Sequence, residues 1–224
     1  AEILETVDRA IEKTDKIIEK YKRIKQGLMQ DLLTKGIDEN GKIRSEKTHK
    51  FKNTPLGRIP EEWEVVRLGE VISYEQPNKY LVKSEKYDKY QGIPVLTAGK
   101  SFILGYTDED FGIYKEVPII LFDDFTTESK YVAFPFKLKS SAAKILKILD
   151  NSNSLFYIYN IMQILNFKPG SEHKRFWISE YSRILIPLPP LSEQQRIAEI
   201  LSQIDNTIEK EEAYKQKLER IKKG

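Results

Sequence analysis

The chain has 224 residues, of which 40% are hydrophobic and 32% are charged, so it can bury a full core in one domain. It contains no cysteine, which excludes disulfide bonds and thiolate metal sites. The net charge of +3 does not by itself indicate a nucleic-acid partner, although a near-neutral domain can carry a basic face. We find no signal peptide and no run of 18 apolar residues, so we expect a soluble cytoplasmic protein without a membrane partner.

The first 27 residues of the chain return as its last 27. Aligned at an offset of 197 positions, the two segments share 13 identical residues. Asp8 aligns with Asp205, and Lys25 aligns with Lys222. A repeat of this length, with one copy of everything between, indicates part of a larger two-part molecule in which one middle unit carries a helix at each end. We therefore interpret the sequence as a fragment of a longer chain.

Both repeated ends show the heptad spacing of coiled-coil helices. We expect a conserved spacer helix over residues 1–34 and a second over residues 192–224. The second has a clear beginning, because Pro189 and Pro190 end the preceding segment and Ser192 can cap the helix. An ordinary surface hairpin of helices is the alternative interpretation. The expected seam residues are Leu4, Val7, Ile11, Ile18, Tyr21, Leu201, Ile204, Ile208 and Leu218.

The middle of the chain divides into a linker and a globular domain. Residues 35–59 are polar and rich in lysine, and Asn40-Gly41 is a strong turn signal within them. The globular domain follows over residues 60–191. Trp63 is expected among its first core residues.

Helix and strand signals are mixed within this domain. One helix is expected to begin at Ser154, whose hydroxyl can cap it. Residues 142–149 fit the helical and the strand period equally poorly, so both remain open there. We therefore predict an α+β fold in which one globular domain is flanked by two long antiparallel coiled-coil helices. The expected strands are residues 93–96, 117–122, 131–136 and 184–188.

Several blocks of sequence carry a family resemblance. Residues 184–197, which lead through Pro189 and Pro190 into the second helix, resemble the specificity subunit of type I restriction-modification enzymes. Residues 59–71 resemble the opening of that family's target-recognition domains, and residues 25–33 resemble the end of its conserved helices. Shorter blocks that resemble one subgroup of these domains are residues 96–100, 122–127 and 136–142.

The resemblance implies an architecture and a function. In the family, two target-recognition domains are held apart by two antiparallel helices, around an internal pseudo-twofold axis. The present chain departs from that plan, because it has both helices and only one recognition domain. The resemblance implies a non-catalytic subunit that reads one half of a bipartite site in double-stranded DNA. Its helices would dock methyltransferase subunits and restriction subunits could join them, while a homodimer would restore two recognition domains.

Candidate DNA contacts lie in polar and basic loops. Lys174 and Arg175 can reach phosphates or guanine edges, where an arginine fork fits the O6 and N7 acceptors. Without the resemblance, the same two charges would suit a solvated loop equally well. Hydroxyl pairs can also donate to DNA, although they populate turns for local reasons. The predicted DNA-binding residues are Lys100, Thr126, Thr127, Lys130, Ser140, Ser141, Lys174 and Arg175.

A lysine-rich stretch and two other functions stay open. Residues 79–90 interleave lysine with tyrosine, which fits either a loop along the DNA backbone or a strand edge protected by lysines. A coiled-coil scaffold that binds protein without reading DNA is the main alternative function. A magnesium-dependent nuclease is a weaker one, based on Asp124 and Glu128. The two histidines, His49 and His173, have no neighbouring ligand pattern, so we expect no metal site and no cofactor.

Overall fold

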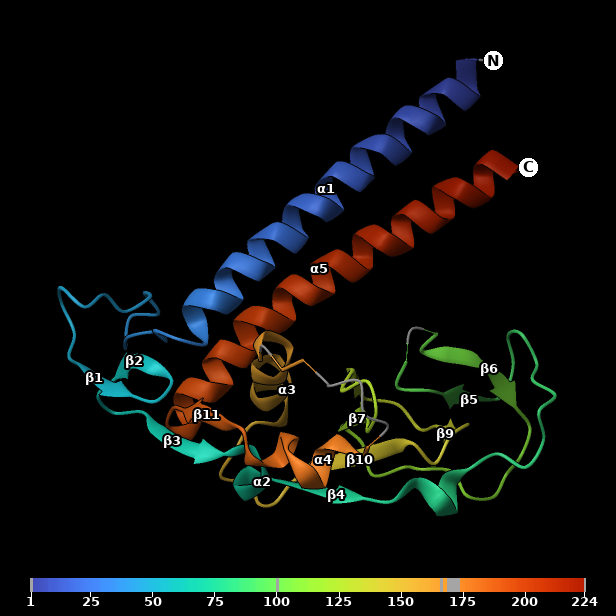
Figure 1. Ribbon diagram of the computed structural model, residues 1–224. Coiled ribbons are helices and arrows are strands. Elements are labelled where there is room, and N and C mark those ends of the chain that lie inside the picture. Colours follow the sequence, from blue (N-terminus) through green and yellow to red (C-terminus); the bar gives the residue numbers. More distant parts are fainter. Residues whose placement is uncertain (1, 100, 166, 169–173, 224) are drawn as a thin grey trace. The chain divides into compact units, whose positions relative to one another are not determined.

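The computed structural model describes residues 2–99, 101–165, 167–168 and 174–223 (Figure 1). None of the helices in these ranges is long and apolar enough to cross a membrane. The chain separates into two compact units, which we call the helical unit and the sheet unit. The helical unit comprises Ala1–Lys52, Arg58–Glu61 and Ser192–Gly224, and the sheet unit comprises Asn53–Gly57 and Glu62–Leu191.

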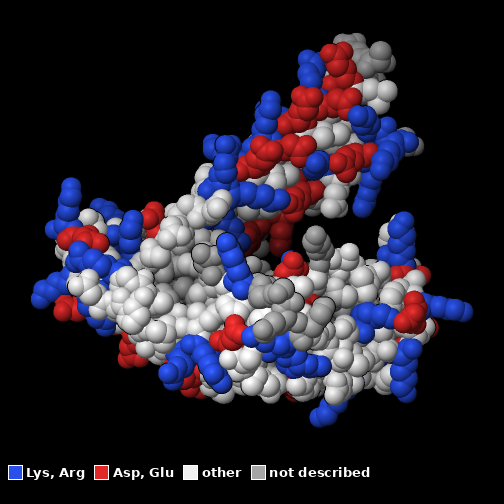
Figure 2. Space-filling model, in the orientation of Figure 1, with Lys and Arg blue, Asp and Glu red and all other residues white. Residues whose placement is uncertain are grey.

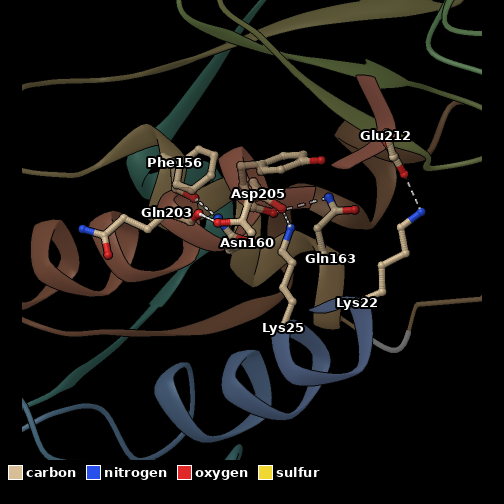
Figure 3. A network of polar contacts seen from close by, with 10 residues as sticks. Lys22, Lys25, Phe156, Asn160, Gln163, Gln203, Asp205 and Glu212 are labelled. Carbon is tan, nitrogen blue, oxygen red and sulfur yellow. Dashed lines mark hydrogen bonds and ion pairs between the residues drawn. The ribbon is translucent and has the colours of Figure 1, made fainter. Parts of the chain in front are cut away.

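The helical unit contains the two long helices. Helix α1 spans Glu2–Leu32 and helix α5 spans Leu191–Lys223, and the two run side by side (Figure 1). Ion pairs along their length show that residue numbers fall on one helix as they rise on the other, so the helices are antiparallel, as predicted. Two of these pairs can be followed in Figure 3. The pairs are Asp8–Lys222 at 2.5 Å, Asp15–Lys215 at 2.7 Å, Lys22–Glu212 at 2.7 Å and Lys25–Asp205 at 2.6 Å.

The sequence repeat reappears as symmetry of the helix pair. Asp8 and Lys25 of α1 align with Asp205 and Lys222 of α5. The Asp8–Lys222 and Lys25–Asp205 ion pairs are therefore the same contact made twice. Two antiparallel helices exchange places only by rotation about a twofold axis perpendicular to the plane that contains them. The hairpin thus has an internal pseudo-twofold axis, and each of its surfaces occurs in two related copies.

The expected seam positions differ in burial. Ile18, Leu201, Ile208 and Leu218 are at most 8% exposed, whereas Leu4 is 49% exposed. The remaining seam residues, Val7, Ile11, Tyr21 and Ile204, are half-buried.

Helix α5 begins one residue earlier than the sequence suggested. Its first residue is Leu191, so Ser192 lies inside the first turn rather than at the cap. Pro190 stands just before the first helical residue. Its fixed φ and missing N–H cost nothing at a position whose amide lacks an intrahelical partner.

The segment after α1 folds against the first turn of α5. The Arg44 guanidinium contacts both carboxylate oxygens of Glu193, with Nη2 3.1 Å from Oε2. The Ile37 amide donates to Oε1 of the same carboxylate at 2.8 Å. The Arg44 and Glu193 side chains are 10% and 8% exposed. Residues 37–44 therefore have a defined conformation, including a turn in which Gly41 adopts a positive φ of 77°.

The sheet unit is built on a four-stranded antiparallel sheet with strand order β4-β10-β7-β8. A three-stranded sheet, β6-β5-β9, and a pair, β11-β3, complete it. Strands β1 and β2 form a separate hairpin at the boundary of the two units. The strands are β1 (Phe51–Thr54), β2 (Gly57–Pro60), β3 (Glu64–Arg67), β4 (Ile72–Glu75), β5 (Ile93–Leu96), β6 (Ile103–Thr107), β7 (Ile119–Asp123), β8 (Ser129–Val132), β9 (Lys137–Leu138), β10 (Ala143–Ile148) and β11 (Leu185–Leu188). The short helices are α2 (Leu68–Val71), α3 (Leu155–Ile164), α4 (Phe176–Ser179) and the 3-10 turns Pro77–Tyr80 and Tyr181–Arg183.

The sheets enclose an apolar core. Its fully buried members come from both sheets and include Leu96, Leu121, Phe136 and Ile145. Each contributes on the order of 2 kcal/mol by leaving water. The mixture of helix and strand confirms the predicted α+β class.

Local predictions for the sheet unit were confirmed in most places. Strand β5 has the predicted bounds, and the hydroxyl of Ser154 caps α3 by accepting the Tyr157 amide. The open segment 142–149 forms the interior strand β10, because only its pairing with β4 and β7 satisfies its backbone. The expected strand 131–136 was wrong in extent, since β8 ends at Val132. Pro135 cannot donate to a strand ladder, which keeps that segment out of the sheet.

A charged cluster joins β4 to β10 and gives a first prediction. Lys147 Nζ lies 3.0 Å from Glu75 Oε2, and the Tyr80 hydroxyl donates to Glu75 Oε1 at 2.7 Å. Partial burial alone would raise the pKa of Glu75, but the hydrogen bonds from Tyr80 and Lys147 outweigh it and lower this pKa. The lowered pKa means that Glu75 stabilises the fold above its unfolded-state pKa, and that this is lost as the pH falls through the folded-state value.

Glu75→Gln is therefore expected to lower the free energy of unfolding by about 1 kcal/mol near neutral pH and by much less near pH 3. Urea titrations at both pH values measure the difference. Glu116→Gln is the control, because Glu116 contacts the same lysine but is 77% exposed. An equal loss at both pH values for Glu75→Gln would contradict the argument.

Candidate nucleic-acid interface

Charge is not segregated over the molecule as a whole. On the face shown in Figure 2, acidic and basic side chains alternate along the helix pair, and those of the sheet unit form small separate groups. A DNA contact on the sheet unit must therefore come from particular loops rather than from bulk charge.

The first such loop is the turn between β7 and β8. Asp123 Oδ1 accepts the amides of Phe125 and Thr126, each at 2.9 Å. The Thr127 amide donates to the Asp123 carbonyl at 2.9 Å, and Thr127 has a φ of 61°. Left-handed backbone is rare for a branched residue and holds only where its surroundings enforce it. The turn is thus a rigid support that exposes Phe125 and Thr126.

The second loop leads into α4. Arg175 is exposed at the N-terminal cap of this helix, and its guanidinium lies 6.0 Å from the centre of the Phe125 ring. Contact with an aromatic ring limits the orientations of a guanidinium while leaving its N–H donors free to bind. Lys174, next to it, forms an ion pair with Glu180 in which both side chains are about 40% exposed.

The third loop joins β9 to β10. Ser140 and Ser141 are exposed there, and Ser140 Oγ accepts the Ala142 amide at 3.1 Å. The Asp124 amide donates to the Ala142 carbonyl at 3.1 Å, which ties this loop to the β7–β8 turn.

Asp124 connects all three loops. Besides its bond to Ala142, its carbonyl accepts the Phe176 amide at 2.9 Å, and its Oδ1 accepts the Trp177 amide at 2.8 Å. The structure therefore brings six predicted contact residues into one region of the sheet unit. They are Thr126, Thr127, Ser140, Ser141, Lys174 and Arg175.

The two other predicted contacts have different outcomes. Lys130 lies half-exposed on β8, opposite Leu121 of β7. Lys100 lies outside the described residues, so the structure gives it no position.

Sequence reasoning missed the buried residues beneath these loops. Lys144 is fully buried, with its Nζ 3.3 Å from Asp124 Oδ2, and Trp177 is only 2% exposed. A lysine between the apolar residues Ala143 and Ile145 was the available signal, because such a strand is unlikely to leave a charge without a partner. Phe125, which contacts Arg175, carried no signal of its own.

The same contacts bear on the nuclease alternative. The Asp124 carboxylate is buried and engaged by Lys144 and by the Trp177 amide. Among the described residues, no group of three or more acidic, histidine or cysteine side chains could hold a metal ion. The carboxylate that this alternative required is thus bound to protein groups.

The lysine-rich stretch forms a loop rather than a strand edge. Glu109 Oε1 accepts the amides of Lys83 and Ser84, at 2.9 and 2.8 Å. Glu109 is in turn held by the fully buried Lys137, whose Nζ lies 2.7 Å from its Oε2. This loop returns to β5 at Gly92, where a Cβ atom would lie 2.4 Å from the Thr107 carbonyl oxygen, so only glycine fits.

Comparison with known proteins places this arrangement in a family. Residues 60–220, well over half of the chain, match the family described as "Type I restriction modification DNA specificity domain". The chain belongs to this family. The resemblance seen in the sequence blocks is thereby confirmed.

Curated relatives in the specificity family are longer than this chain. It is 46% identical over 160 residues to the Escherichia coli "Type I restriction enzyme EcoR124I/EcoR124II specificity subunit", covering 69% of this chain and 39% of the relative. It is 31% identical over 242 residues to the Methanocaldococcus jannaschii "Putative type I restriction enzyme MjaX specificity subunit", covering 100% of this chain and 53% of the relative. The chain thus spans about half the length of these relatives or less.

A solved structure shares the fold. The crystal structure of the type I restriction-modification S subunit from M. genitalium has a TM-score of 0.72 and 15% sequence identity to this chain. The similarity covers 99% of this chain and 57% of that structure. The helix pair and the sheet unit together therefore correspond to a specificity-subunit fold.

Proposed function

We propose that this chain recognises one half of a bipartite sequence in double-stranded DNA as part of a type I restriction-modification system. The observation that carries the proposal is the convergence of three loops on Asp124, which gathers hydroxyl, lysine and arginine donors in one region of a family member. Arg175 would read a base edge in the major groove. Lys174 and the threonine and serine hydroxyls would contact phosphates or neighbouring bases.

We further propose that the helix pair docks methyltransferase subunits and sets the distance to a second recognition domain. Its pseudo-twofold axis supports this, because each surface of the hairpin occurs in two related copies and two identical partners could bind equivalently. Methyl transfer and any cleavage would belong to the methyltransferase and restriction subunits, and this chain would be non-catalytic.

The second recognition domain would come from a second copy of the chain or from another polypeptide. The helices α1 and α5 already pair within one chain, so a homodimer would use an outer surface of the hairpin or an exchange of helices. Either arrangement would generate a twofold-symmetric protein, which matches a palindromic target.

The test is to map methylated adenines in DNA from cells that co-express this chain with its methyltransferase subunit. A gapped palindromic motif is expected if two copies each read one half-site. An asymmetric gapped motif would mean that another chain supplies the second domain. Assembly of the complex without sequence-specific methylation would overturn DNA recognition and favour the protein-binding scaffold.

A further inference from the structure

A buried ion pair lies directly beneath the three loops. The side chains of Asp124 and Lys144 are both 0% exposed, with Oδ2 and Nζ 3.3 Å apart. Lys144 Nζ also donates to Gln76 Oε1 at 3.0 Å and lies 5.2 Å from the centre of the Tyr74 ring. Replacing such a pair with apolar residues of similar volume is often neutral or even stabilising, because burying two charges is costly. Stability alone is therefore a weak reason for this pair to be present.

The pair is placed where it can control geometry. Lys144 stands opposite Phe122 in the β10–β7 register, and Asp124 follows two residues later on the same face of the sheet. Lys144 therefore fixes the position of Asp124 relative to the rigid central strands. Through its amide, carbonyl and carboxylate, Asp124 then holds the Ser140–Ala142 turn and the start of α4.

Loop position matters unequally for the two kinds of DNA contact. A bidentate hydrogen bond to a base edge needs two donors in one fixed geometry, whereas a contact to a phosphate tolerates small displacements. A shift of about 1 Å is enough to impair a site of the first kind. Arg175, on the loop that Asp124 holds, would be the side chain most affected.

We propose that the Asp124–Lys144 ion pair is a positioning element for sequence recognition, which sets the three loops so that Arg175 meets one base with a single geometry. This inference rests on the proposed DNA recognition. Loss of the pair should reduce discrimination between bases more than it reduces total affinity for DNA.

The test uses a double variant that removes both charges together, Asp124→Asn with Lys144→Met. Asparagine keeps an Oδ1 acceptor for the Trp177 amide, and neither partner is left as an unpaired buried charge. The full chain, in complex with its methyltransferase subunit, selects from duplex DNA with a randomised half-site. Discrimination at the Arg175 position is expected to fall about tenfold, with non-specific affinity unchanged within about twofold.

Combination with Arg175→Ala separates positioning from a general structural role. If the ion pair acts through the Arg175 loop, the double variant has no further effect on that base position once Arg175 is absent. A merely structural role predicts the same loss in both backgrounds and at every position of the half-site. That result would overturn the inference.

A second buried pair offers a matched control in the same unit. Lys137 and Glu109 are 0% and 10% exposed and lie 2.7 Å apart, but they hold the 83–84 and 109–111 segments instead. Lys137→Met with Glu109→Gln is expected to leave discrimination at the Arg175 position unchanged. An equal loss in this control would overturn the inference.

A milder variant covers the case in which the double variant does not fold. Gln76 is exposed, so Gln76→Ala loosens Lys144 without disturbing the core, and discrimination should fall about threefold. Unchanged preference in a folded variant overturns the positioning role alone. A wild-type complex with no base preference overturns the proposed function, and this inference falls with it.

Discussion

Arg44→Met is expected to lower the free energy of unfolding by about 3 kcal/mol or more. The Arg44 guanidinium engages both carboxylate oxygens of Glu193, and both side chains are about 90% buried. Methionine fills a similar volume but leaves the Glu193 carboxylate with a buried charge that has lost its bidentate partner. Breaking a buried pair in this way is far more costly than replacing both partners, because the remaining charge stays desolvated.

Thermal and urea unfolding of the purified chain measure the effect. A loss of about 3 kcal/mol corresponds to a decrease in Tm of roughly 10 °C for a protein of this size. Arg58→Met is the matched control, because Arg58 pairs with Glu46 where both side chains are 51% exposed. It should cost well under about 1 kcal/mol. Similar losses for the two variants would show that burial of the Arg44–Glu193 pair does not matter.

Arg175→Ala is expected to relax the DNA target at one base position and to leave the others unchanged. An arginine that binds a guanine through O6 and N7 contributes about 1–3 kcal/mol of discrimination, which corresponds to about 5- to 150-fold. The guanidinium is exposed and its orientation is limited by the Phe125 ring, so removing it should not disturb the core. The thermal stability of the variant should therefore equal that of the wild type.

Adenine-methylation mapping with the co-expressed methyltransferase subunit gives the motif of each variant. Arg183→Ala is the control, since Arg183 is an exposed arginine of the same unit that lies outside the three loops. Its motif should match that of the wild type. An unchanged motif and unchanged methylation efficiency for Arg175→Ala would remove Arg175 from the base contacts. A uniform loss across all sequences would assign it to phosphate instead.

Local and periodic features of the fold were predictable from the sequence. The helix pair announced itself through heptad spacing and through a repeat that needs no structural knowledge to detect. The cap of α3 at Ser154 and the bounds of β5 follow from short-range preferences, which act within a few residues. Where such preferences conflicted, at residues 142–149, the decision came from pairing with two distant strands.

The sequence by itself determined the α+β class, the two antiparallel helices and the family to which the chain belongs. The tertiary structure alone decided which polar residues gather, because the three loops are separated along the chain and meet only through hydrogen bonds to Asp124. It also changed the role of Asp124 from a possible metal ligand to the buried partner of Lys144. The physical reason is that strand register, which places Lys144 opposite Phe122, depends on long-range pairing and not on local sequence.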